Sequence, residues 1–109
     1  MKKALTLIAV SAFFLNLNLL GDDSDPVKAN WDRHCKKCHA EDGSGATKIG
    51  EKLEIKDYTD AAVLAEFSDE DLFTMTKDGV DGTKMKGYGK KLSDDEITAL
   101  VAYMRAMVK

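Results

Sequence analysis

Residues 34–39 read HCKKCH and contain both cysteines and both histidines of a 109-residue chain. These side chains are the ones that most readily bind a metal or form a covalent cross-link. A chain this short buries little apolar surface, and domains of this size usually depend on disulfides, a metal or another cross-link for stability. The fold must therefore be built around Cys35 and Cys38.

Residues 1–21 differ in composition from the rest of the chain. Lys2 and Lys3 precede ALTLIAVSAFFL, twelve residues without a charge, which matches the basic n-region and apolar h-region of an export signal. We interpret residues 1–21 as an export signal peptide and residues 22–109 as one mature domain. An uncleaved membrane anchor is the alternative, because the 18 residues of 4–21 fall within the roughly 17–25 that a membrane-spanning helix needs. Either interpretation places the mature domain outside the cytoplasm, in the periplasm.

The mature domain is modestly acidic. Without Lys2 and Lys3, 14 of the 16 basic residues remain against 19 acidic ones. No strongly basic stripe indicates nucleic acid as a partner. The membrane is an expected partner only if the N-terminal segment stays uncleaved, and we expect a monomer.

Residues 22–109 are predicted to be all-α. Asp25 and Pro26 predict the cap and first residue of a helix that extends to about Cys38. Glycines make residues 40–50 a predicted loop, and a short helix is expected around residues 60–66. No segment shows the alternation of a half-buried strand.

Two further helices have clear start signals. Ser68 predicts the cap of a helix that ends before Gly79. Residues 80–89 then form a predicted glycine-rich loop. Ser93 and Glu96 form a capping box for a last helix that runs to about Val108. Its apolar positions make one stripe, which consists of Ile97, Leu100, Val101, Met104 and Val108.

Four chemistries could use the cysteine–histidine cluster. A disulfide between Cys35 and Cys38 would close too small a ring to stabilise the fold much. Thioredoxin-type redox chemistry expects a βαβ pattern, which is absent from the sequence. Zinc needs four ligands, but the two adjacent Cys–His pairs can rarely point at one ion, and no second ligand pair follows.

Covalent haem accounts for every feature of the cluster. C-x-x-C-H is the attachment motif of c-type haem. Cys35 and Cys38 lie on one face of a helical turn, so both thiols can reach the two vinyl groups of one porphyrin. His39 then binds the iron. His34 precedes the motif and faces another way, so we expect a surface histidine there.

The group opposite His39 decides what the iron does. Filling both axial positions makes an electron carrier, whereas an open site makes a ligand binder or a catalyst. Met75, Met104 and Met107 fall in predicted helices, where packing explains them. Met85 is an isolated thioether in a polar, glycine-rich loop and is the candidate ligand.

The chain resembles the class I cytochromes c, of the small monohaem bacterial kind. The shared stretches are WDRHCKKCHAEDGSG, KMKGYGKKLSDDEI and ALVAYM, which occur in the expected order and cover most of residues 26–109. The resemblance implies a small cytochrome c fold, with three to four helices packed around one haem and the N- and C-terminal helices crossing. It implies aromatic packing at the crossing, for which Trp31 and Tyr103 are the candidates.

The resemblance also assigns the site. It implies thioether bonds to one haem c at Cys35 and Cys38, with His39 and Met85 as the axial ligands of the iron. The expected function is electron transfer by Fe(III)/Fe(II) cycling, in an electron carrier rather than an enzyme. The alternative is a haem-based ligand-binding or sensor protein in which Met85 is displaceable.

The chain departs from the family pattern in two places. Many relatives have a proline just after the axial methionine, whereas Lys86 and Gly87 follow Met85 here, so we expect a looser loop. Relatives often have a Gly-Pro whose carbonyl accepts the Nδ1–H of the axial histidine. Pro26 is the only proline here, so we expect another carbonyl within residues 48–58 to accept this hydrogen bond.

The expected partners are redox proteins with an acidic docking surface. Lysines near the two ligand-bearing segments could ring the exposed haem edge and steer such a partner. They are Lys36, Lys37, Lys84, Lys86, Lys90 and Lys91. The alternative is that they are ordinary surface lysines.

Overall fold

The structure is a computed structural model that describes residues 25–109. The predicted signal segment, residues 1–21, lies outside the described residues. No helix within residues 25–109 is long and apolar enough to cross a membrane.

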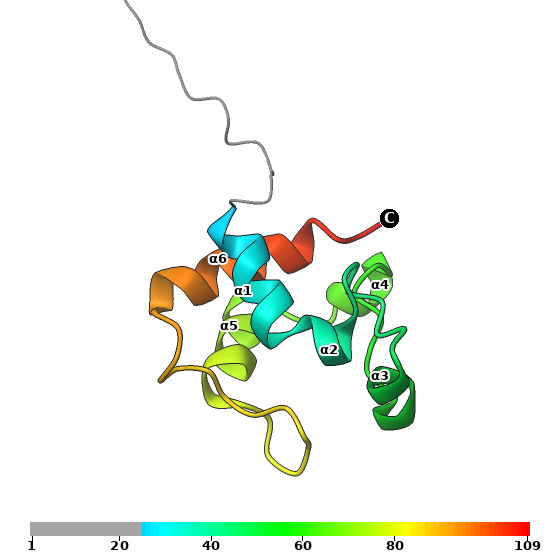
Figure 1. The fold of residues 1–109 in the computed structure, drawn as a ribbon. Helices are drawn as coiled ribbons and strands as arrows, with labels where there is room; N and C mark the ends of the chain where they lie inside the picture. Colours follow the sequence, from blue (N-terminus) through cyan, green and yellow to red (C-terminus); the bar gives the residue numbers. More distant parts are fainter. Residues whose placement is uncertain (1–24) are drawn as a thin grey trace, which may run out of the picture.

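The described chain folds into helices and loops, as predicted (Figure 1). A single antiparallel bridge, between Gly79 and Lys86, is the only strand-like pairing in residues 25–109. The helices are α1 (Pro26–His34), α2 (Lys36–His39), α3 (Lys48–Leu53), α4 (Ala61–Leu64), α5 (Asp69–Asp78) and α6 (Asp94–Arg105). In this described part of the chain, six helices thus replace the expected three to four, because three of them are only one or two turns long.

The predicted helix starts are confirmed by their capping bonds. Asp25 accepts a 2.9 Å hydrogen bond from the backbone of Val27 at the start of α1. Ser68 and Ser93 each close a capping box, with Asp71 at the start of α5 and with Glu96 at the start of α6. These local bonds satisfy the free N–H groups of the first turn.

Three predicted boundaries are wrong. The first helix breaks at Cys35, whose φ of −118° departs from helical geometry, and α2 follows. The expected loop at 40–50 gives way to α3, which Thr47 caps through Gly50. The last helix ends at Arg105, so the exposed Val108 does not extend the buried stripe. After Arg105 the chain leaves the helix, and the backbone N–H of Lys109 donates a hydrogen bond to the Thr59 carbonyl.

The N- and C-terminal helices pack against each other, as the cytochrome resemblance implied (Figure 1). Trp31 of α1 is 1% exposed, and its ring lies 5.7 Å from that of Tyr103 on α6. Ile97 and Leu100 of α6 are fully buried, and α5 contributes Leu72 to the same core. The predicted aromatic contact between the two helices is therefore confirmed.

Candidate functional site

A cavity of about 950 Å³ lies beneath the contact of these helices. Its walls come from the end of α1, from α2, from α5 and from the segments 53–58 and 80–88. This volume is at the upper end of the roughly 300–1,000 Å³ typical of cofactor sites. The structure brings the predicted site residues Cys35, Cys38, His39 and Met85 to the lining of this one cavity.

The attachment motif forms a single helical turn along the cavity wall. The carbonyl of Cys35 accepts hydrogen bonds from the backbone N–H groups of Cys38 (3.2 Å) and His39 (2.9 Å). This turn keeps the two sulfur-bearing side chains on one face, as the i, i+3 spacing predicts. Both cysteines are free thiols and partly buried.

The chain turns sharply directly after His39. Ala40 has φ 72° and ψ 165°. This region of backbone conformation is almost reserved for glycine and stores strain in other residues. The indole Nε1–H of Trp31 donates a 3.0 Å hydrogen bond to the Ala40 carbonyl. This bond connects the contact between α1 and α6 to the backbone directly after His39.

His39 lies between aromatic rings at the cavity wall. Tyr58 stacks on the imidazole with the ring centroids 5.3 Å apart and an angle of 17° between planes, and Trp31 lies 5.9 Å away. Burial lowers the pKa of His39, so the ring is neutral and can bind a metal. Its Nδ1 is buried without a hydrogen-bond partner within the described residues. The carbonyl expected within residues 48–58 is therefore not in place here.

The Cys35 thiol does not have the electrostatics of a reactive dithiol. Burial, with a smaller contribution from Cys38, raises the pKa of Cys35 to about 12. Reactive dithiols instead have a lowered thiol pKa. Across residues 25–109, no three His, Cys, Asp or Glu side chains are grouped so as to hold a metal ion, and the zinc alternative lacks its ligand set.

Met85 also lines the cavity, on a loop that is closed at its base. Its carbonyl accepts a 2.9 Å hydrogen bond from the backbone N–H of Val80. Its own N–H donates to the hydroxyl of Thr83, 3.1 Å away, and that hydroxyl donates to the Val80 carbonyl. The loop is thus closed by its own hydrogen bonds without the proline that many relatives have. The expected looseness of the loop stays a prediction.

Two glycines allow this closure. Gly79 has φ +82°, and a Cβ on it would lie 2.7 Å from the backbone nitrogen of Gly87. A Cβ on Gly87 would meet the carbonyl oxygen of Lys77. The backbone N–H of Tyr88 donates a hydrogen bond to the Thr76 carbonyl (2.9 Å), and that of Gly89 donates to the Lys77 carbonyl (3.0 Å). These bonds hold the chain after Met85 against the end of α5. We call residues 76–80 and 85–89 the neck of the Met85 loop.

The other methionines lie where packing explains them. Met104 is buried in the core, and Met107 packs against it from the chain end. Met75 packs on the core from α5 and lines the cavity, as Met104 also does. Met75 is partly buried like Met85 and is therefore the natural comparison for Met85 in any test of ligation.

His34 is less of a surface residue than expected. It is partly buried and lines the cavity, and its ring centroid lies 5.3 Å from that of Tyr88. The Tyr88 hydroxyl donates a 3.2 Å hydrogen bond to the His34 carbonyl. The helix end before the attachment motif is thereby joined to the segment after Met85.

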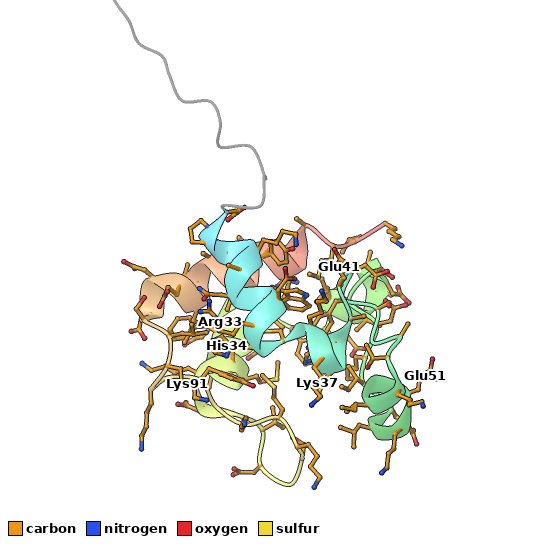
Figure 2. The ribbon with its side chains drawn as sticks, viewed as in Figure 1. Arg33, His34, Lys37, Glu41, Glu51 and Lys91 are labelled. Atoms are coloured by element: carbon orange, nitrogen blue, oxygen red, sulfur yellow. The ribbon has the colours of Figure 1, made fainter. Side chains whose placement is uncertain are left out.

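The six predicted lysines are all exposed, and Lys84 and Lys86 also line the cavity. Figure 2 shows Arg33, His34 and Lys91 gathered on one side of the molecule, with Glu41 and Glu51 on the other. Residues 33–37 and 84–91 contain seven of the 14 lysines and arginines in the described chain and none of its aspartates or glutamates. These two segments thus carry a local excess of positive charge.

The donor set fits a covalently attached haem. Two free thiols, a neutral imidazole and a thioether surround one large cavity. An imidazole and a thioether are iron ligands in electron-transfer haem proteins. Sequence reasoning missed Tyr58 against His39, Tyr88 against His34 and the neck, since none of these contacts has a local sequence signal.

The chain matches one protein family and several solved structures. Residues 22–104 match the family described as cytochrome C oxidase, cbb3-type, subunit III. The KustC0563 c-type cytochrome is 33% identical, with a TM-score of 0.69 over 75% of this chain and 96% of that one. A mutant of that cytochrome is 32% identical, with a TM-score of 0.67 over 74% of this chain and 96% of that one. No curated protein gives a significant match.

A family match over this length, with a fold shared by solved c-type cytochromes, identifies the class of protein. The chain belongs to the family described as cytochrome C oxidase, cbb3-type, subunit III, and it is a c-type cytochrome domain.

Proposed function

We propose that this chain is a periplasmic electron carrier with a single covalently bound haem c. In this proposal Cys35 and Cys38 form the thioether bonds, and His39 and Met85 are the axial ligands. The observation that supports it best is that one cavity is lined by the attachment turn and, from a separate closed loop, by Met85. The export-type pattern of residues 1–21 supports the compartment.

The residues divide the work of holding the cofactor. Haem supplies the one-electron Fe(III)/Fe(II) chemistry when it is bound. The turn at 35–39 fixes the attachment points, and Tyr58 and Trp31 hold the plane of the His39 ring. The surrounding apolar wall excludes water, and a low dielectric together with a soft thioether disfavours the extra charge of the oxidised state.

The closed Met85 loop favours a carrier over a sensor. A ligand that stays in place in both oxidation states leaves little to rearrange during electron transfer, whereas a sensor needs its ligand to leave. Three hydrogen bonds and the close approach of two glycines hold the loop shut. We therefore expect the closed conformation of this loop to predominate over the open one.

The local excess of positive charge indicates the class of redox partner. Segments 33–37 and 84–91 contain no acidic residue, and each contributes residues to the cavity lining. An acidic docking surface on a partner protein would be attracted there, and its association rate would fall as salt is added.

Spectra of two matched variants test the ligation. We expect wild-type protein, produced in a host that attaches haem, to show the methionine–iron charge-transfer band when oxidised. Met85→Leu removes the thioether from the loop, and Met75→Leu removes the other partly buried thioether of the cavity. The band should disappear in the first variant and persist in the second.

Other outcomes are equally informative. A band that survives in Met85→Leu and is lost in Met75→Leu would show that the proposal names the wrong methionine. Rapid binding of carbon monoxide to the reduced wild type would favour the sensor. Protein without covalent haem would end the proposal.

A further inference from the structure

His34 is held close to the expected attachment point of the cofactor. It is the last residue of α1 and directly precedes Cys35 in the chain. Its ring rests against Tyr88, its carbonyl accepts from the Tyr88 hydroxyl, and both residues line the cavity. The imidazole is therefore fixed at the cavity wall.

Charged groups from three parts of the fold face this imidazole. Burial is the largest influence and lowers the pKa of His34, and the cations of Arg33 on α1 and Lys91 after the Met85 loop lower it further. Glu96 at the start of α6 acts in the opposite direction. Tyr88 is the remaining titratable group in contact with the ring, and burial raises its pKa above the ordinary value for a tyrosine. The ring is thus neutral near pH 7, and it takes up a proton at a pH below the ordinary pKa of a histidine.

We propose that His34 is a redox-linked proton site, which gains a proton when the iron is reduced and loses it when the iron is oxidised. The inference rests on the proposed function, because it needs the iron in the cavity. One electron arrives from the donor protein and one proton arrives from solvent at the His34 ring. Both leave on oxidation, the electron to the acceptor protein and the proton to solvent.

The physical reason is Coulombic. Oxidation adds one positive charge to the centre, and a positive imidazolium nearby is then disfavoured. At an effective dielectric of about 20, a unit charge within roughly 15 Å changes a proton affinity several-fold. We expect the affinity of His34 for a proton to be about three- to tenfold higher in the reduced protein.

The sign of the pH dependence follows. Well below both pKa values the ring is charged in both oxidation states, and well above them it is neutral in both. Between them reduction is accompanied by proton uptake. The midpoint potential should therefore fall as pH rises through the window between the two pKa values and level off above it.

The test measures the midpoint potential against pH on the haem-loaded full chain. Wild type should show the sloping window, and His34→Gln should show a flat profile across it. Lys91→Gln removes a cation that lowers the pKa of His34, so its window should move to higher pH. NMR titration of the His34 ring in wild type, oxidised and reduced, measures the same linkage without any substitution.

Several results would overturn the inference. A flat wild-type profile would do so, as would a slope that His34→Gln retains, since another group would then carry the proton. Equal His34 pKa values in the two oxidation states would also refute it. In each case an intact methionine–iron band would leave the proposed function standing, whereas loss of covalent haem would refute the function itself.

Discussion

Gly87→Ala should open the Met85 loop. A Cβ at this position would lie 2.6 Å from the carbonyl carbon of Asp78 and would also meet the carbonyl oxygen of Lys77. Both are backbone atoms at the end of α5, so neither can move aside easily. The neck must shift, and the bonds from Val80 to Met85 and from Tyr88 to Thr76 must weaken with it.

The magnitude follows from the cost of overpacking, which is about 1–3 kcal/mol. Opening the loop relieves this clash, so the open state gains that amount relative to the closed one. Since about 1.4 kcal/mol corresponds to a factor of ten, the open fraction should rise about 5- to 150-fold. A ligand that binds only the open state gains apparent affinity by the same factor.

The assay is a spectroscopic titration of the oxidised, haem-loaded protein with imidazole. Gly89→Ala is the matched control, because it lies two residues further along the same segment. Its Cβ would approach the flexible Lys77 side chain at 3.0 Å and the Lys77 carbonyl oxygen at 3.2 Å. We expect a much smaller change there. Wild-type affinity in Gly87→Ala, or an equal rise in both variants, would refute the role of the neck.

Three further changes test the rest of the fold. Trp31→Phe deletes the bond to the strained Ala40 carbonyl, and denaturant unfolding should show a loss of about 2 kcal/mol; an unchanged midpoint would contradict this. Arg105→Lys removes a guanidinium that donates to the backbone carbonyls of Leu64, at the end of α4, and Phe67, before α5, and the same assay should show a loss of about 1–3 kcal/mol. The double change Cys35→Ser and Cys38→Ser should yield colourless protein with little helical circular dichroism, because haem supplies much of the core; a native-like spectrum would contradict that.

Much of the fold was predictable because its signals are local. Ser68 and Ser93 indicate their helices within four residues, and the i, i+3, i+4 stripe of α6 identifies the buried face. The resemblance to the class I cytochromes c also implied the contact of α1 with α6. The caps and the apolar stripe depend only on residues close together in the sequence.

The remaining features depend on pairings between distant segments. The break at Cys35, where φ is −118°, has no local sequence signal such as a proline or a glycine. The neck joins the end of α5 to the segment after Met85 through backbone hydrogen bonds. Backbone groups are the same in every residue, so only the glycines that permit the close approach are visible in the sequence. Tyr58 reaches His39 only because its N–H bonds to the Gly43 carbonyl, 2.8 Å away. His34 looked like a surface residue because Tyr88, its contact, is 54 positions away.

Proton NMR of the reduced protein, with its methionine methyl groups labelled, tests the central claim most directly. A methionine bound to the iron holds its methyl group over the porphyrin face, where the ring current shifts the resonance far upfield. The account predicts one such methyl signal, absent from Met85→Leu and present in Met75→Leu. Methionine methyl signals that all fall in the ordinary range, or an upfield signal assigned to Met75, would contradict it.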